Sequence, residues 1–527
     1  MKLFLLEITA PSENSHDSSA LAHLPVMLNR FPFKAIVLGL LAPLLSAAPA
    51  LAQVNTDEFK TFADWCNNQE QLIPAQQHTV QVLLDKAKTG NCNDAASFLE
   101  NQQSLKLNNK QIEDVTPLAV LTNLQVLELN WNQLEDITPL SVLINLQYLW
   151  LHGTQIEDIT PLVSLTNLEG LGLSQNQLKD ITPLISLTHL KSIGLRGNQL
   201  EDIAPLANLP HLQALWLSEN QIEDITPLTN LTNLQILWLS ENQIEDITPL
   251  AGLTNLKRLD LSNNIIEELT PLALLVSLQE LNLEFNQVKN IAPLMSLVDL
   301  HNLSLYENQI EDITPLSSLT YLQILWLNAN QIEDIMPLSS LANLQWLGLR
   351  LNQIEDITPL SSLTNLQRLD LDWNQIEDIS PLATLTNLQA LGLSKNRIED
   401  VEPLSALANL YSLVLGDNEI EDIESLSSLR NLQELFLNGN QITDISHLSS
   451  LTNLEDLWLH ENQIADVNPL SSLVSLQWLI LHKNKITDIT PLTALTNLTQ
   501  LSLGNNPIKE KICPVQDSMT CSFDDSD

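Results

Sequence analysis

Residues 234–255 read LQILWLSENQIEDITPLAGLTN, and residues 366–387 read LQRLDLDWNQIEDISPLATLTN. The same 22-residue pattern recurs without insertion from Leu105 to Ile508, so nineteen copies follow one another. A fixed period of this length is typical of a solenoid, in which each copy is one structural unit stacked on its neighbours. The length of 527 residues therefore does not indicate the number of domains, because a solenoid grows by adding units.

Each copy is predicted to contain one short strand. We number the columns of the repeat from its Asn, for example Asn220, and Leu stands three columns before it in all nineteen copies. Leu also stands five columns before it in all copies but one, which has Ile193. Apolar residues two positions apart predict a strand with one buried face, and stacked copies predict a parallel sheet.

The second half of each copy predicts the return path behind the sheet. Apolar residues stand two and five columns after the Asn, as in Ile222 and Ile225, and most copies have Pro seven columns after it, as in Pro227. Pro fixes φ and lacks an N–H, so it excludes a long helix here. We expect an α/β repeat solenoid with a concave parallel sheet and convex segments that are extended or 3₁₀-helical.

The Asn column itself is expected to be structural. Seventeen of the nineteen copies carry the Asn, and Lys110 and Thr154 replace it in the other two. A chain that leaves a strand in a tight turn buries N–H and C=O groups, and an inward carboxamide can hydrogen-bond to both. Because Thr154 offers only a hydroxyl, we expect a local irregularity there.

The pattern L-x-x-L-x-L-x-x-N-x-I-x-D-I-x-P-L, present in residues 231–250 as LTNLQILWLSENQIEDITPL, resembles the 22-residue leucine-rich repeat subclass typified by bacterial internalins. The resemblance covers roughly residues 105 to 510. It implies a leucine-rich repeat horseshoe whose concave sheet recognises proteins or other surface ligands. The flanking segments FADWC and NPIKEKICP are similar to the caps of secreted bacterial repeat proteins.

Residues 1–52 are predicted to be a signal peptide. Two basic residues, Arg30 and Lys34, precede an apolar stretch that ends in small residues, so we expect cleavage after Ala52. A membrane anchor is the alternative, which two prolines in this stretch disfavour. Met27 is an alternative translation start, because acidic residues precede it. The mature chain is expected to be secreted or retained in the periplasm or cell envelope, without membrane insertion.

The remaining chain divides into a helical N-terminal cap over residues 53–103, the repeats over 104–510, and a C-terminal cap and tail over 511–527. An even number of cysteines in an exported chain indicates disulfides, and bridged Cα atoms lie within about 7 Å. Since the cysteines flank opposite ends of the solenoid, only Cys66 with Cys92 and Cys513 with Cys521 can pair. Two short amphipathic helices are predicted in the N-terminal cap from these residues: Phe59, Phe62, Trp65, Val80, Leu83, Leu84 and Ala87.

The composition excludes several classes of partner. The chain has 64 acidic and 23 basic residues, a formal charge of −41, which disfavours nucleic acid and anionic membrane surfaces. No phosphate-binding Gly loop, nucleophile turn or metalloprotease motif is present, so we expect no enzyme and no cofactor. His460 and His482 share a column in adjacent copies, but the pattern offers no third ligand for a metal site.

Aromatic residues gather in the outward columns of the predicted strands. Such side chains are typical binding anchors, although they could instead tile neighbouring strands and stiffen the sheet. Glycines such as Gly172 and Gly348 are expected to leave shallow depressions between the aromatic bands. The predicted ligand-binding aromatics are Trp150, Trp216, Trp238, Trp326, Trp346, Phe436, Trp458 and Trp478.

Charged residues interleave with these aromatics. Arg258, Arg368 and Asp370 are predicted to add polar specificity, and solvated pairs of little energetic weight are the alternative.

Glu-Asp follows the Asn by three and four columns in most copies, and these two columns hold 31 of the 64 acidic residues. We expect the Asp to accept N–H bonds from the following turn while the Glu stays solvated. A row of weak calcium sites is the competing hypothesis.

Two functions remain. The first is a non-catalytic binding protein that holds a protein or glycan on its concave face. The second is a structural or divalent-cation-binding component of the envelope or cell surface, in which the acidic edge is the active feature.

Overall fold

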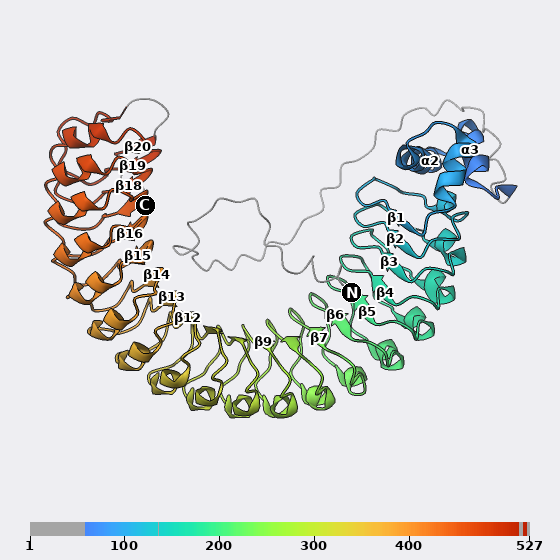
Figure 1. The fold of residues 1–527 in the computed structure, drawn as a ribbon, viewed down its shortest axis with the longest axis horizontal. Helices are drawn as coiled ribbons and strands as arrows, with labels where there is room; N and C mark the ends of the chain where they lie inside the picture. The colour runs from blue at the N-terminus through green and yellow to red at the C-terminus, as the bar shows by residue number, and fades with distance from the viewer. Residues whose placement is uncertain (1–57, 135, 516–519, 524–527) are drawn as a thin grey trace, which may run out of the picture. The chain divides into compact units, whose positions relative to one another are not determined.

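The repeats fold as one continuous parallel sheet backed by 3₁₀ helices. The computed structural model describes residues 58–134, 136–515 and 520–523. The predicted signal peptide, residues 1–52, and the alternative start Met27 lie outside these residues. Within the unit Gln53–Asp527 the strands line the inner side of the solenoid and the 3₁₀ helices its outer side (Figure 1). The predicted solenoid with a concave parallel sheet is confirmed.

The sheet has twenty strands of three residues each. Each strand pairs in parallel with the next one along the chain, with equal columns opposite each other, as in Leu237 and Leu259. The strands are β1 Ser104–Lys106, β2 Val126–Glu128, β3 Tyr148–Trp150, β4 Gly170–Gly172, β5 Ser192–Gly194, β6 Ala214–Trp216, β7 Ile236–Trp238, β8 Arg258–Asp260, β9 Glu280–Asn282, β10 Asn302–Ser304, β11 Ile324–Trp326, β12 Trp346–Gly348, β13 Arg368–Asp370, β14 Ala390–Gly392, β15 Ser412–Val414, β16 Glu434–Phe436, β17 Asp456–Trp458, β18 Trp478–Ile480, β19 Gln500–Ser502 and β20 Thr520–Ser522.

Among the described residues, one short 3₁₀ helix follows each of the strands β1 to β18 and lies behind the sheet, and Pro at its second residue in most copies limits its length. These helices are η3 Thr116–Leu118, η4 Thr138–Val142, η5 Thr160–Ser164, η6 Thr182–Ser186, η7 Ala204–Asn208, η8 Thr226–Leu228, η9 Thr248–Gly252, η10 Thr270–Leu274, η11 Ala292–Ser296, η12 Thr314–Ser318, η13 Met336–Ser340, η14 Thr358–Ser362, η15 Ser380–Thr384, η16 Glu402–Ala406, η17 Glu424–Ser428, η18 Ser446–Ser450, η19 Asn468–Ser472 and η20 Thr490–Ala494.

The Asn column forms a buried ladder along the turn that follows each strand. In a central copy, Asn264 Nδ2 donates to the carbonyls of Leu239 and Leu261, both at 3.0 Å. Its Oδ1 accepts the N–H of Ile244 at 3.0 Å. The residue before the Asn has a positive φ in all nineteen copies, so the ladder fixes a strained turn. The structural interpretation of this column is confirmed.

The two copies without Asn deviate in the same way. Besides the usual left-handed residue, the residue after Lys110 or Thr154 also has a positive φ, 56° at Gln111 and 66° at Gln155. The buried Thr154 hydroxyl donates to the carbonyl of Leu151, which replaces one of the carboxamide bonds. A hydroxyl therefore replaces the carboxamide only with an extra distortion of the turn, as expected.

The N-terminal cap contains three α-helices, α1 Phe62–Asn67, α2 Pro74–Ala87 and α3 Cys92–Leu99, together with the 3₁₀ helix η2 Gln69–Gln71. Both helices predicted from the sequence are present, as α1 and α2, whereas α3 was not predicted. The third helix is capped by Asn91, whose Oδ1 accepts the N–H groups of two residues in its first turn. Cys66 and Cys92 form a disulfide that joins α1 to α3.

The C-terminal cap closes the other end of the sheet. Strand β20 pairs with β19, so the last leucine-rich strand is not the edge of the sheet. Cys521 in β20 forms a disulfide with Cys513, and both pairings expected from the sequence are therefore present. No helix among the described residues has the length and apolar composition that a membrane-spanning segment requires.

Candidate binding site on the concave face

The predicted aromatic residues all lie on the strands of the concave sheet, but their exposure differs. Trp216 and Phe436 are only 7% and 9% exposed, whereas Trp478 is 41% exposed. Trp216 packs edge-on against Trp238 with ring centroids 6.5 Å apart, and Phe436 packs in the same way against Trp458 at 4.9 Å. Neighbouring rings thus bury each other, and only part of each aromatic band is available to a ligand.

At two of the four glycines between the aromatic bands, Gly172 and Gly348, a Trp ring occupies the space where a depression was expected. A Cβ atom on Gly348 would overlap with the ring of Trp326, and one on Gly172 would overlap with that of Trp150. Each of these Trp side chains leans along the sheet onto the glycine of the next strand. The prediction of shallow depressions was wrong at Gly172 and Gly348, because these glycines make room for the preceding Trp ring, whereas no Trp ring lies against Gly194 or Gly392.

Cationic side chains stack on two indole rings further along the sheet. The Arg368 guanidinium lies 4.9 Å from the Trp346 ring centroid, and Lys395 Nζ lies 3.8 Å from that of Trp373. Stacking of this kind holds the rings in place and adds positive charge to a strongly acidic molecule. Trp150 also stacks on His152, with ring centroids 5.9 Å apart, but burial lowers the pKa of His152 to about 4, so this imidazole is neutral.

Asp370 lies beside the buried carboxylate of Asp372, two residues along the chain. Asp370 Oδ1 accepts the N–H of Asp372 at 3.1 Å, and Asp372 Oδ1 accepts the N–H of Ser394 at 2.7 Å. Burial and the neighbouring Asp370 charge raise the pKa of Asp372 to about 7, while burial raises the pKa of Asp370. The charge of this part of the sheet therefore changes near neutral pH.

His460 and His482 stack on each other with ring centroids 4.4 Å apart. Over the described residues, no group of three or more His, Cys, Asp or Glu side chains is placed to hold a metal ion.

A concavity on the sheet lies between Trp238 on β7 and Trp326 on β11. Five residues of one outward column face one another in register across these strands: Trp238, Asp260, Asn282, Ser304 and Trp326. Two large rings thus flank three short polar side chains, which leaves a cavity of about 320 Å³. Binding sites for small ligands and side chains commonly begin near this volume. We call this cavity the concave basin.

Polar side chains line the concave basin and are partly held by bonds to each other. Arg258 Nε lies 3.3 Å from Glu280 Oε2 on the next strand. Asp260 Oδ1 accepts the N–H of Ser262 at 3.0 Å, and the Ser304 hydroxyl donates to Glu284. Three carboxylates and one guanidinium give the basin a net negative charge. It is therefore suited to a ligand that combines apolar groups with positive charge.

Both Trp residues that flank the concave basin were predicted from the sequence, but most of the polar residues between them were not. Trp238, Trp326 and Arg258 were predicted, whereas Glu280, Asn282, Glu284, Asn302 and Ser304 were not. Within its own repeat, none of these residues differs from the variable polar residues expected at an outward strand position. Reading the outward column across consecutive copies would have shown the run Trp-Asp-Asn-Ser-Trp.

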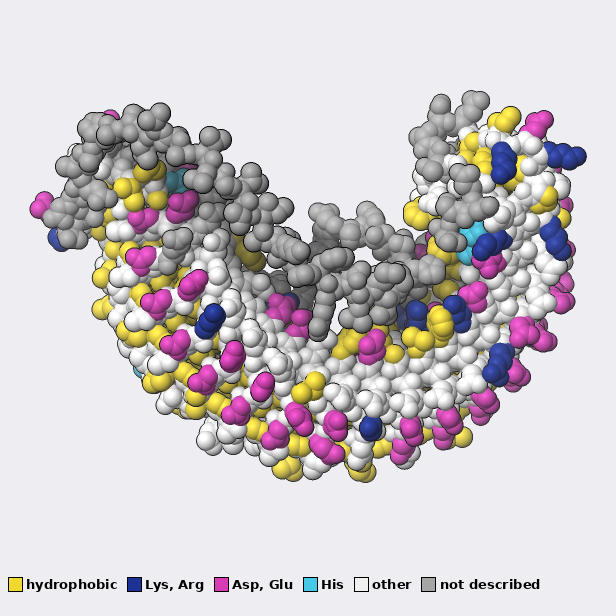
Figure 2. All heavy atoms as spheres, turned by 180° about the vertical axis from the view of Figure 1, so that it is seen from behind, with side chains coloured by type: hydrophobic (Ala, Val, Ile, Leu, Met, Phe, Trp, Pro, Cys, Tyr) yellow, Lys and Arg dark blue, Asp and Glu magenta, His cyan; other side chains and the backbone are white. Residues whose placement is uncertain are grey.

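The acidic columns form a row along one edge of the solenoid, where Figure 2 shows Asp and Glu side chains following the rim. The Asp residues of this column accept the N–H two residues later, as Asp224 does from Thr226 at 2.8 Å. Hydrogen bonds from the hydroxyl and the N–H of Thr226 lower the pKa of Asp224. Asn290, which replaces Asp in one copy, accepts the same bond. The expected role of the Asp in the following turn is confirmed.

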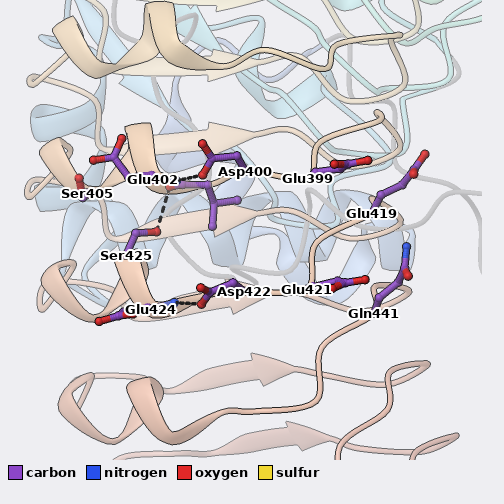
Figure 3. A pocket seen from close by; sticks show the side chains of 11 residues that line it. Glu399, Asp400, Glu402, Ser405, Glu419, Glu421, Asp422, Glu424, Ser425 and Gln441 are labelled. Atoms are coloured by element: carbon purple, nitrogen blue, oxygen red, sulfur yellow. Dashed lines mark hydrogen bonds between the residues drawn. The ribbon is translucent and has the colours of Figure 1, made fainter.

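A cavity of about 700 Å³ on this edge lies between η16 and η17 (Figure 3). Glu402 and Glu424 add to the usual Glu-Asp pairs here, and Ser425 replaces the Pro of the repeat. The Ser425 hydroxyl donates to the carbonyl of Val401 at 3.0 Å, which ties the two copies together. The cavity is lined by Glu399, Asp400, Val401, Glu402, Ser405, Glu419, Glu421, Asp422, Glu424, Ser425 and Gln441.

We expect millimolar calcium and its removal by chelator to leave the unfolding temperature unchanged. The Asp carboxylates already accept N–H bonds, and the Glu side chains beside them extend into solvent. Differential scanning calorimetry in the two buffers checks this. A rise of several degrees in calcium that is abolished by Asp400→Asn with Asp422→Asn would contradict it and support the cation-binding alternative.

Comparison with known proteins agrees with the fold. Residue ranges of the chain match the family described as Leucine Rich repeats (2 copies), and residues 120–137 match a further Leucine Rich repeat description. The chain therefore belongs to the leucine-rich repeat proteins. The ranges are 144–186, 188–230, 232–274, 276–318, 299–343, 342–384, 386–428, 430–472 and 474–515. A comparison with curated proteins gives no match.

Among solved structures, the chain is similar to the ectodomain of the receptor kinase GASSHO1/SCHENGEN3 from Arabidopsis thaliana, solved in complex with CASPARIAN STRIP INTEGRITY FACTOR 2. The identity is 24% and the TM-score 0.64, over 82% of this chain and 54% of the receptor chain. The chain thus spans about half the length of that receptor. A leucine-rich repeat protein of Leptospira interrogans is 25% identical with a TM-score of 0.53, over 77% and 96% of the chains.

An internalin of Listeria monocytogenes is 27% identical with a TM-score of 0.38, over 77% of this chain and 96% of the internalin. Membership of the internalin subclass remains a prediction.

Proposed function

We propose that this protein is a non-catalytic, extracellular binding protein that holds a polypeptide segment of a partner in the concave basin. The in-register run Trp238, Asp260, Asn282, Ser304 and Trp326 carries this proposal. Two disulfides support a location outside the reducing cytosol. The receptor ectodomain of similar fold was also solved with a bound ligand.

The chemistry of the basin favours a polypeptide. Its two indole walls provide apolar anchor positions, and aromatic anchors contribute a large share of the binding energy in such interfaces. Its floor offers carboxylates and carboxamides that can accept and donate hydrogen bonds to a backbone or to a Lys or Arg side chain. A neutral glycan would use the indole rings and leave the excess negative charge without a counterpart.

The acidic edge supports a second candidate function. The cavity between η16 and η17 has carboxylates from two consecutive copies and lies outside the concave sheet. Through this edge the protein would bind divalent cations or a strongly basic partner, as a structural component of the envelope or cell surface.

The test is a selection of displayed random peptides on the purified chain. We expect peptides with apolar anchors and at least one Lys or Arg, and we expect the double variant Trp238→Ala with Trp326→Ala to weaken their binding about 100-fold or more. Trp131→Ala is the matched control, because this exposed Trp lies at a turn outside the basin. Glu399→Gln with Glu421→Gln tests the acidic edge.

The outcomes separate the candidates. Loss of binding only in the basin variant supports the proposed site. Loss only in the acidic-edge variant moves the site to that edge. If no peptide is selected and a glycan array gives ligands that depend on Trp238, the glycan replaces the polypeptide as the ligand class.

A further inference from the structure

Five apolar side chains are exposed together on the side of the solenoid behind β8 to β10. Leu274 in η10 is 62% exposed, Met295 in η11 58%, and Tyr321 after η12 57%. Val276 and Val298 lie beside them and are also exposed. Most other copies have Ser, Ala or Thr in the columns of Leu274, Val276, Met295 and Val298, and Asn in the column of Tyr321. We call this surface, made of Leu274, Val276, Met295, Val298 and Tyr321, the apolar patch, and a contiguous group of this kind is typical of an interaction surface.

The same three copies lack a second ladder that joins most other repeats. Thirteen columns after its ladder Asn, most copies have another Asn, whose side chain donates to a carbonyl of the preceding copy. Asn255, for example, donates to the carbonyl of Thr232 at 2.8 Å. At the apolar patch this column holds Ser277, Asp299 and Tyr321 in consecutive copies. Packing within the solenoid therefore does not explain the residues of the patch.

The apolar patch is also almost free of charge in a strongly acidic chain. Asp299 is the one charged residue in the segments 270–278, 292–300 and 314–322. The acidic columns lie between each strand and its 3₁₀ helix, whereas the patch lies between each 3₁₀ helix and the following strand, which is the opposite edge. Two copies with a net charge of −41 each can approach most closely through such a surface.

We propose that the apolar patch is the contact between two copies of this chain related by a two-fold axis. Lys257 is the exposed Lys just before β8. Along the solenoid it lies about one repeat before Val276, and Asp299 lies about one repeat after Val276. A two-fold axis at Val276 therefore brings Lys257 of each copy opposite Asp299 of the other. Neither residue has an ion-pair partner among the described residues, so both are available for this contact.

A smaller apolar group on the same edge lacks these features. Val142, Ile144, Val163 and Ile185 are exposed, but Asn145 and Asn167 keep the second ladder there. The nearby Lys191 and Glu169 already pair with each other within the chain at 2.7 Å.

The test is sedimentation equilibrium of the purified chain and its variants. We expect a dimer, and we expect the quadruple variant L274S, V276T, M295S and V298T to raise the dissociation constant about 100-fold or more. The substituted residues occur in the same columns of other copies, so the fold should be kept, and circular dichroism checks this. The matched control V142S, I144T and V163S should remain dimeric.

The proposed contact between Lys257 of one copy and Asp299 of the other gives an independent test of the dimer. Lys257→Glu should raise the dissociation constant about tenfold, and adding Asp299→Lys should restore it. A chain that is monomeric at every concentration overturns the proposal. Dissociation caused by the control variant, or a charge exchange that fails to restore the dimer, also overturns it by placing the contact elsewhere.

Discussion

Substitution Asn264→Leu is expected to lower the free energy of unfolding by about 3–5 kcal/mol, because it leaves several buried backbone groups without partners. The carboxamide donates to the carbonyls of Leu239 and Leu261 and accepts from the N–H of Ile244, and it is itself buried. Leucine has nearly the same volume and hydrogen-bonds to none of them. The cost is large because the turn also holds a left-handed residue, Asn263.

Chemical unfolding followed by circular dichroism measures this change. Asn255→Ala is the matched control, since it removes one exposed bond to Thr232 and should cost less than about 1 kcal/mol. Equal effects of Asn264→Leu and Asn255→Ala would show that the buried ladder contributes no more than an exposed side-chain bond, and would contradict the structural role of the column.

The second large effect is expected at Asp372, where Asp372→Asn should stabilise the protein at pH 8 and leave its stability unchanged at pH 4. Burial and the charge of Asp370 raise the pKa of this carboxyl to about 7. The folded state therefore binds a proton more tightly than the unfolded state, and stability falls as pH rises from about 4 to about 7. At pH 8 the variant should gain roughly 2–4 kcal/mol.

Thermal unfolding of both proteins across this pH range measures the difference. Asp224→Asn is the control with the opposite sign, because hydrogen bonds from Thr226 lower the pKa of Asp224. Its contribution is present at neutral pH and lost in acid, so that variant should be slightly less stable at pH 8. A pH-independent effect of Asp372→Asn would contradict the raised pKa.

Most of the fold could be predicted because its determinants recur nineteen times. The Leu columns, the Asn ladder and the Pro column indicate the same packing in all or most copies, as Leu237, Asn264 and Pro249 do. The N-terminal cap contains no repeated pattern, so its helices had to be predicted from single residues. The helix α3 was missed because its start is marked only by Asn91 and its apolar face is short.

The candidate site was predictable only in part, because its shape depends on how side chains lean. A column assignment places Trp326 on the outward face but does not show that its ring covers Gly348. Nor does it show that Trp216 and Trp238 bury each other. The basin floor depends on the register between copies, which places Asp260 beside Asn282.

The uniform strand register also restricts how an extended chain can lie across the sheet. Strands recur about every 4.8 Å, whereas side chains on one face of an extended polypeptide recur about every 6.7 Å. Because the two spacings differ, a ligand side chain and a strand return to the same relative position only about every seven strands. Such a ligand therefore cannot contact every repeat in the same way. Trp238 and Trp326 are four strands apart, roughly 19 Å, which is close to three ligand steps. Under the proposed function, an extended ligand that contacts both rings would therefore carry its two anchor residues six positions apart in sequence.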